Sequence, residues 1–149
     1  GGCDDDEECE IKFSIKDVVT KYDKEAQQRV SQVISDAFPS HNFLGEEDVA
    51  AGGEASAKAL SEKLNSEYLW ICDPIDGTAN FASGLPICGV TMAVLYRGTP
   101  VVAAIFDPNR SEMFSTITGQ GAWMTTKDGQ KTPLSVQSRV TSISDAIIN

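Results

Sequence analysis

The sequence predicts an α+β fold in which helices come first and an antiparallel meander of strands follows. Three observations support this class. Helix-forming segments lie in the first half of the chain, and β-rich segments dominate the second half. The β-rich segments are joined by short glycine-containing turns rather than by helices. We therefore expect a layered sandwich of helices on a sheet.

The first half is expected to contain two helices and two strands. Residues 11–20 alternate loosely, which indicates an irregular or strand-like segment, and a helix is expected after them that ends at Pro39. Helical spacing gives this helix an apolar face made of Val30, Val33, Ile34 and Ala37. A short strand is expected at residues 42–44 and a helix at residues 55–64, which are rich in helix formers. Residues 68–72 have the aromatic and branched composition of a buried strand.

The second half is a series of strands. Residues 87–96 and 101–106 are β-rich and are joined by the hairpin sequence Arg-Gly-Thr-Pro. Further strands are expected at residues 113–117 and 122–125, with a Gly-Gln-Gly turn between them. Asp128-Gly129 indicates another turn, and residues 146–148 begin one more strand.

Composition narrows the function classes. The 149 residues are 41% hydrophobic and 23% charged, which is typical of one globular domain. No apolar run approaches the roughly 20 residues of a membrane-spanning helix, so we expect no membrane partner. The net charge of -10 argues against nucleic acid as a partner, because a phosphate backbone requires a basic face.

The acidic excess is concentrated at one end. We expect residues 1–10 to form an acidic arm and residues 11–149 to form the α+β domain. The acids of the arm are Asp4, Asp5, Asp6, Glu7, Glu8 and Glu10. Such a run is typical of a solvated arm, and a docking or cation-binding arm is the alternative.

The four cysteines are Cys3, Cys9, Cys72 and Cys88, and none forms a C-x-x-C pair. Structural zinc is therefore not expected. The last two lie in apolar runs and are interpreted as small buried hydrophobes, whereas the pairing of the first two stays open. A reducing compartment is the default, either the cytoplasm or the interior of an organelle.

Two carboxylates follow the predicted buried strand. Asp73 and Asp76 lie three residues apart, with a proline between them and a glycine after them. Like charges held closely together need a cation or a shared proton to compensate them. Oxygen ligands without a nearby histidine favour magnesium over zinc, and the carbonyl of Ile75 adds a further oxygen. An ordinary Asp-capped turn is the alternative interpretation.

The residues after this turn offer donors to an anion. Thr78 is a plausible N-cap for a short helix through Phe81. The amides of Gly77 and Thr78 would then open the helix, where unpaired N–H groups attract phosphate. A cation beside an anion site is the arrangement of phosphoryl-transfer enzymes.

The sequence of residues 73–81, Asp-Pro-Ile-Asp-Gly-Thr-Ala-Asn-Phe, is similar to the metal-binding signature of the inositol monophosphatase family. Other features of that family occur in the same order along the chain. They are Asp17-Val18-Val19-Thr20 with Asp23, Gly45-Glu46-Glu47, Trp70-Ile71-Cys72, and Gly119-Gln120-Gly121-Ala122. The resemblance implies the α/β sandwich of inositol monophosphatases and fructose-bisphosphatases.

The resemblance also implies roles for individual residues. Glu46, Asp73 and the carbonyl of Ile75 would bind one magnesium ion, and Asp73 with Asp76 a second. Thr78 and Asp23 would orient and deprotonate the attacking water, with help from Glu47. Glu46, Asp76 and the amides of Gly77 and Thr78 would contact the substrate. Lys12 would be a mobile-loop lysine near a third, weaker metal.

Each of these residues also has an ordinary structural interpretation. Glu46 and Glu47 fit a solvated acidic loop that continues into Asp48. Asp23 fits a helix N-cap, and Thr78 fits a cap alone. His41 is expected at the surface, and Trp70 and Trp123 are expected in the core.

The family resemblance implies a magnesium-dependent, lithium-sensitive phosphatase that hydrolyses a small phosphomonoester, similar to inositol monophosphate, and that is a homodimer at full length. Members of the family are nearly twice as long as this chain. Their first helix and their later Trp-Asp-x-Ala-Ala motif are missing here, so we expect an incomplete fold that is poorly active alone. The alternatives are a sister activity, fructose-bisphosphatase or bisphosphate nucleotidase, and a non-catalytic interaction module.

Overall fold

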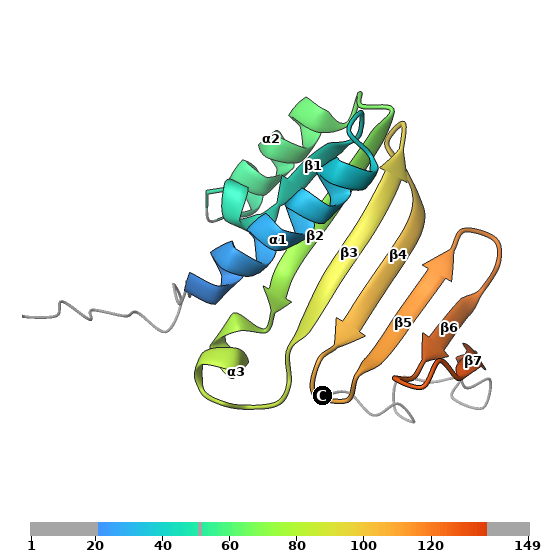
Figure 1. The fold of residues 1–149 in the computed structure, drawn as a ribbon. Helices are drawn as coiled ribbons and strands as arrows, with labels where there is room; N and C mark the ends of the chain where they lie inside the picture. Colours follow the sequence, from blue (N-terminus) through green and yellow to red (C-terminus); the bar gives the residue numbers. More distant parts are fainter. Residues whose placement is uncertain (1–20, 51, 137–149) are drawn as a thin grey trace, which may run out of the picture.

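Strands form one sheet whose spatial order follows the sequence (Figure 1). The computed structural model describes residues 21–50 and 52–136. The strands of this part are β1 Asn42–Gly45, β2 Tyr68–Asp76, β3 Gly89–Tyr96, β4 Thr99–Asp107, β5 Glu112–Ile117, β6 Ala122–Thr125 and β7 Lys131–Leu134. β1 pairs with β2 in parallel, and each later neighbour pairs antiparallel. The predicted meander is confirmed, and β7 is an additional strand that the sequence pattern did not indicate.

Helices accompany the first strands of the sheet. They are α1 Lys21–Ala37, the 3-10 turn η1 Glu46–Asp48, α2 Gly53–Lys63 and α3 Thr78–Ala82. α2 connects β1 to β2, because parallel neighbours need a crossover and not a tight turn. The α+β class and the predicted helices are confirmed. No helix in the two described ranges combines the length and the apolarity needed to cross a membrane.

The buried face of α1 differs from the prediction. Val33 is 68% exposed, whereas Ile34 is 6% exposed. The buried positions on α1 also include two polar residues, Asp23 and Gln27, one helical turn apart. The expected all-apolar face was therefore wrong, because polar groups replace apolar ones in the half of the helix nearest to the end of β2.

The two long helices cover opposite faces of the sheet. Leu60 of α2 and Leu64, which caps its C-terminal end, pack on a core of Leu44, Leu69 and Leu95. Side chains alternate along a strand, so Trp70 points to the other face from Leu69. There its ring lies 5.6 Å from that of Phe38, which directly follows α1.

His41 belongs to this second layer. Its ring stacks on Phe38 at 4.9 Å and on Tyr68 at 4.3 Å, and its Nδ1 accepts a hydrogen bond from Trp70 Nε1 at 3.0 Å. His41 is half-buried, so the expectation that it lies at the surface holds only in part. Trp70 and Trp123 are both half-buried, and Lys131 Nζ lies 4.7 Å from the ring centroid of Trp123.

The predicted hairpin between β3 and β4 is confirmed, but its turn is tighter than expected, because Thr99 and Pro100 belong to β4 and not to the connection. Arg97 and Gly98 have φ values of 48° and 79°, and they connect the paired residues Tyr96 and Thr99. Positive φ at both central residues is typical of the type I′ turn, whose twist suits a two-residue hairpin.

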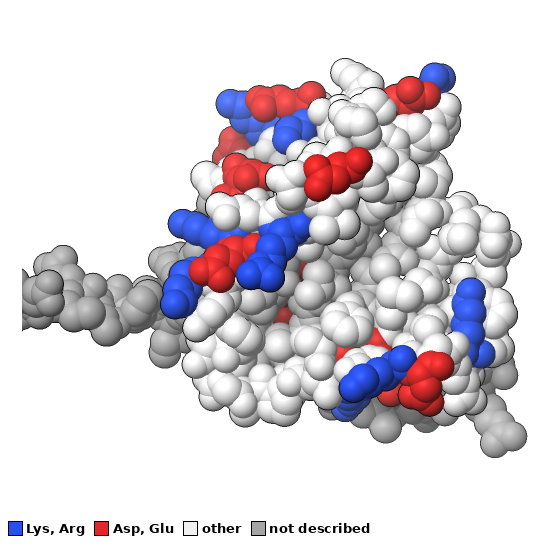
Figure 2. All heavy atoms as spheres, viewed as in Figure 1, with Lys and Arg blue, Asp and Glu red and all other residues white. Residues whose placement is uncertain are grey.

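Beyond the helices, the sheet exposes apolar side chains. Ile105 is 48% exposed and Phe106 is 41% exposed. As neighbours in β4 they point to opposite faces, so neither face is fully covered at this strand. Figure 2 shows Lys and Arg interspersed with Asp and Glu over the helices, with few charged groups over β3 and β4.

Several sequence-based predictions concern residues outside the described ranges. They are the acidic arm 1–10, the segment 11–20 with Lys12 and the motif at 17–20, Cys3 and Cys9, and the strand at 146–148.

Candidate active site

The two aspartates lie inside β2 and not in a turn after it. β2 extends to Asp76, and its pairing with β3 shifts between Asp73, opposite Thr91, and Asp76, opposite Gly89. One extra residue on β2 makes this a β-bulge. The proline at position 74 explains the bulge, because it has no N–H to donate to the ladder. The expected turn was therefore wrong, and a bulge in a paired strand holds the two carboxylates.

Glu46 and Asp73 come together because β1 and β2 run side by side. Gly45 pairs with Cys72, so the residues that follow them are neighbours at the same end of the sheet. Burial, followed by the charge of Glu46 and a hydrogen bond with its carboxyl group, raises the pKa of Asp73 to about 7. Asp76 contributes less, and the Ile75 N–H, which donates to Asp73 Oδ1 at 3.1 Å, opposes the shift.

The other two predicted metal ligands, Asp76 and the Ile75 carbonyl, lie near the Glu46–Asp73 pair but are not in direct contact with both carboxylates. Asp76 is exposed and acts on Asp73 only through its charge. The Ile75 carbonyl accepts a hydrogen bond from Thr78 Oγ1 at 3.0 Å. Within residues 21–50 and 52–136, no three acidic, histidine or cysteine side chains are close enough to form a metal site by themselves.

The facing pair of Glu46 and Asp73 nevertheless has the chemistry of a hard-cation site. Its donors are carboxylate oxygens, and a bound cation would favour the ionised form of Asp73, whose pKa is raised to about 7. Burial, and then the charge of Asp73, also raises the pKa of the nearby Cys72 thiol to about 11. The donor set therefore fits magnesium, and the assignment of these residues as ligands stays a prediction.

Asp23 and Thr78 form a second pair beside the first. Asp23 is 1% exposed, and Thr78 Oγ1 lies 3.5 Å from its Oδ1. α1 already includes Lys21, so Asp23 lies within the helix and is not its N-cap. The N-cap of α3 is Gly77, with φ 86°, and Thr78 is the first helical residue. Both predicted capping roles were wrong, which leaves a hydroxyl–carboxylate pair.

Gly77 has a positive φ and is also closely packed. A Cβ at this position would lie 2.8 Å from the Ile87 carbonyl oxygen and 3.4 Å from the Cα of Cys88. Only glycine therefore brings this backbone so close to the start of β3. The amides of Gly77 and Thr78 open α3, although a helix of five residues has only a small dipole.

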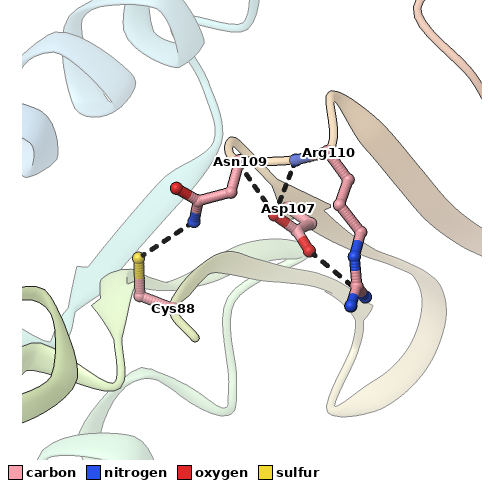
Figure 3. Close-up of polar contacts among 4 residues, drawn as sticks. All are labelled: Cys88, Asp107, Asn109 and Arg110. Carbon is pink, nitrogen blue, oxygen red and sulfur yellow. Dashed lines mark hydrogen bonds and ion pairs between the residues drawn. The ribbon is translucent and has the colours of Figure 1, made fainter. Parts of the chain in front are cut away.

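The segment opposite Gly77 is held by the β4–β5 turn (Figure 3). Asn109 Nδ2 donates to Cys88 Sγ at 3.8 Å. Asp107 Oδ1 shapes the turn by accepting hydrogen bonds from the N–H groups of Asn109 at 2.8 Å and Arg110 at 3.1 Å. Cys88 is half-buried, so the expectation that it is a buried hydrophobe holds only in part.

Glu47 lies next to both pairs. Burial, followed by the charge of Asp23, raises the pKa of Glu47, and Lys24 partly opposes this shift. A cavity of about 920 Å³ begins among these groups and continues along the sheet over Ile71 and Ala93. Its polar lining includes Lys24, Glu46, Glu47, Asp73 and Thr78.

Sequence reasoning missed Gln27 and Asp48. Gln27 is 7% exposed, its Oε1 accepts from the Glu47 N–H at 3.0 Å, and its Nε2 donates to Asp48 Oδ1 at 3.0 Å. A signal was present in the sequence, because positions 23, 27, 30 and 34 repeat at helical spacing and continue the apolar face with polar residues. Only the apolar members of that series were assigned to the buried face, and Asp23 was singled out for its resemblance to a family motif and not for this spacing.

Comparison with known proteins gives consistent matches. Residues 3–148 match the inositol monophosphatase family. Inositol monophosphatase 1 of Solanum lycopersicum is 37% identical over 111 residues, which are 74% of this chain and 38% of that protein. Nus factor SuhB of Vibrio cholerae is 40% identical over 106 residues, 71% of this chain and 36% of that protein.

A solved structure agrees with these matches. The IMPase/NADP phosphatase complexed with Mg²⁺ and phosphate has a TM-score of 0.58 and 31% sequence identity, covering 71% of this chain and 37% of that one. The chain therefore spans well under half the length of the proteins it matches.

Proposed function

The chain belongs to the inositol monophosphatase family, and we propose that the full-length protein is a magnesium-dependent phosphatase of small phosphomonoesters such as an inositol monophosphate. The predicted family resemblance and fold type are confirmed. The activity is proposed for the full-length protein, because this chain spans only 36 to 38% of the relatives described above.

The observation that carries the proposal is the facing of Glu46 and Asp73. Asp73 has a pKa near 7 because it is buried against another carboxyl group, so the pair attracts a cation at neutral pH. Glu46, Asp73, Asp76 and the carbonyl of Ile75 would hold magnesium. When bound, magnesium supplies positive charge that offsets the phosphate dianion and favours deprotonation of water.

The second pair supplies the proton chemistry. Asp23 lies at the outer limit of hydrogen-bonding distance from the Thr78 hydroxyl, at 3.5 Å. We propose that this hydroxyl orients the attacking water and that Asp23 accepts the proton that is released. Glu47, whose pKa is raised by burial and by Asp23, assists from beside the pair. Water would then attack phosphorus, the P–O bond to the alcohol would break, and a proton would reach the leaving alcohol.

The residues that contact the substrate phosphate are proposed from their positions. The amides of Gly77 and Thr78 begin α3, and the close packing of Gly77 fixes that backbone. Glu46 and Asp76 would contact the substrate from β1 and β2. The sister activities, fructose-bisphosphatase and bisphosphate nucleotidase, differ in the alcohol and share this arrangement.

A non-catalytic role is the alternative from a different class. Its support is the similarity to a protein named Nus factor SuhB, at 40% identity. In this alternative the protein has the same fold but does not hydrolyse a substrate. The two possibilities therefore differ in whether the protein releases phosphate.

The test is phosphate release by the purified full-length protein from inositol 1-phosphate, during a magnesium titration. The change Asp73→Asn should lower kcat/KM at least about a hundredfold, because several kcal/mol of charge stabilisation are lost. Asp128→Asn is the matched control, because Asp128 lies in the turn between β6 and β7, far along the sheet from the candidate site. Magnesium uptake without phosphate release from any phosphomonoester would favour the non-catalytic role, and absence of uptake would contradict the magnesium site.

A further inference from the structure

We propose that Gln27 is a positioning residue for the metal site, because it locks the turn that carries Glu46 and Glu47 onto the helix that carries Asp23. This inference rests on the function proposed above. Gln27 lies on α1. It is not a candidate metal ligand, and the mechanism proposed above assigns it no role.

The turn that carries the two glutamates is too short to hold its own shape. η1 contains only Glu46–Asp48, and a 3-10 turn of three residues has little intrinsic stability. Its first residue, Glu46, must nevertheless face Asp73 across the end of two strands. Within the turn, the Val49 N–H donates to the Glu46 carbonyl at 3.0 Å, but a contact with another element is required to fix the turn relative to the sheet.

Gln27 provides that anchor with both ends of its carboxamide. Oε1 accepts from the Glu47 N–H at 3.0 Å, and Nε2 donates to Asp48 Oδ1 at 3.0 Å. Asp48 Oδ2 in turn accepts from the Gly45 N–H at 3.2 Å. These bonds hold the residues before, within and at the end of η1 in one network, which we call the Gln27 clamp.

The surroundings of the clamp leave little freedom. Gln27 is 7% exposed, so a lost hydrogen bond would leave a buried polar group without a partner. A Cβ at Gly45 would collide with the Oε1 and the Cδ of Gln27, so the carboxamide lies directly against the backbone. The clamp is therefore packed as well as hydrogen-bonded.

The position of Gln27 on α1 connects the clamp to the Asp23–Thr78 pair. Asp23 lies one turn earlier on the same buried face and contacts Thr78 at 3.5 Å. One rigid helix thus holds the Asp23–Thr78 pair at one point and the Glu46–Glu47 turn at the next. The Gln27 clamp sets the distance between the metal ligands and the groups that handle the water.

A charge-swapped double variant tests this directly. In Gln27→Glu a carboxylate would face the carboxylate of Asp48, which breaks the clamp by repulsion. In Gln27→Glu with Asp48→Asn, the new glutamate can accept from the Glu47 N–H and from the new asparagine amide. The asparagine oxygen can still accept from the Gly45 N–H. The double variant can therefore form all three hydrogen bonds of the wild type, and only the bond between positions 27 and 48 has its donor and acceptor exchanged. The total charge is that of the wild type.

The primary measurement is calorimetric magnesium uptake by the full-length protein without substrate. Gln27→Glu should weaken magnesium binding about tenfold, as is usual when a residue that orients a ligand is lost, and the swap should restore it to within about threefold. In kinetics, the magnesium concentration for half-maximal turnover should shift by the same factor, while kcat at saturating magnesium changes less.

The matched control is Gln32→Glu on the same helix. Gln32 Nε2 donates to Asp36 Oδ1 at 2.7 Å in an exposed pair, so this variant adds the same charge and removes the same kind of bond. It should leave magnesium uptake unchanged. The isosteric variant Gln27→Met removes both bonds without adding charge, and it carries the test if Gln27→Glu fails to fold.

The outcomes separate the two proposals. If the wild type takes up magnesium and hydrolyses phosphomonoesters, but Gln27→Glu or Gln27→Met lowers only the melting temperature, Gln27 is merely structural and this inference is wrong. Failure of the swap to restore binding would also overturn the clamp. If the wild type takes up no magnesium, the proposed function fails first, and this inference fails with it.

Discussion

The Thr78 hydroxyl oxygen lies 3.5 Å from the Oδ1 of Asp23, although 55 positions separate the two residues in the chain. The contact joins the first described turn of α1 to the start of α3. Because Thr78 also donates to the Ile75 carbonyl at 3.0 Å, the Asp23 contact stays long while that bond is made. In the proposed mechanism we expect the Thr78 hydroxyl to give up this local bond when it binds the attacking water.

Replacement of Thr78 should impair turnover without removing the cation site. We expect Thr78→Val to lower kcat about 10² to 10⁴-fold, the usual contribution of a positioned proton-transfer group, while magnesium uptake is kept. Thr78→Ser retains the hydroxyl and should lose much less. Thr118→Val removes an exposed hydroxyl that bonds to the Pro100 carbonyl at 2.9 Å and serves as the control. Equal loss in the valine and serine variants would contradict a role for the hydroxyl.

Magnesium affinity should depend on pH because of Asp73. Its pKa of about 7 means that the metal-free site still holds a proton at pH 6, and magnesium must displace it. We expect affinity to rise about tenfold from pH 6 to pH 8, in line with the deprotonated fraction of one such group. Calorimetry at several pH values measures this, and a flat profile would count against the raised pKa.

The same shift has a consequence for stability. Burial and Glu46 raise the pKa of Asp73 above its ordinary value of 3.8, so the folded metal-free protein keeps a proton that the unfolded chain has released. The stability from this group is present below about pH 4 and is lost as the pH rises to about 7. The metal-free Asp73→Asn variant should show a flatter melting profile over this range, whereas Asp128→Asn should keep the wild-type slope.

Gly77→Ala should be strongly destabilising. The positive φ of 86° strains any other residue, and the new methyl group would lie 2.8 Å from the Ile87 carbonyl oxygen. We expect a loss of about 2–4 kcal/mol in the free energy of unfolding, from strain and overpacking together. Gly84→Ala separates the two causes, because Gly84 has φ 73° and an added methyl group there would meet nothing within 4 Å. Denaturant unfolding that gives equal losses would show that packing at Gly77 is unimportant.

Gly45→Ala should disturb the Gln27 clamp from the other side. The methyl group would collide with the carboxamide of Gln27, so we expect a loss of about 1–3 kcal/mol in the free energy of unfolding. Gly53→Ala is the control, since nothing lies within 4 Å of a Cβ there and its φ is not positive. Adding Gln27→Ala should recover part of the stability of Gly45→Ala. No recovery would mean that the collision is not the cause.

Local chemistry made much of the fold predictable. The hairpin followed from the glycine-containing link at residues 97–100 between two β-rich runs, although the turn itself is only Arg97-Gly98, and the end of α1 followed from Pro39. β7 was missed since Lys131–Leu134 is short and exposed along its whole length, and its pairing with β6 defines it as a strand.

The sequence by itself determined most of the helices and strands, apart from β7 and the last part of β2, and which carboxylates accompany the Asp-Pro-Ile-Asp-Gly-Thr motif, because backbone preference and side-chain chemistry act over a few residues. The tertiary structure alone decided that Glu46 faces Asp73, that Asp23 reaches Thr78, and that Gln27 anchors η1. These contacts join residues 20 or more positions apart. They arise from strand pairing and from helix packing on the sheet, which local sequence preferences do not specify.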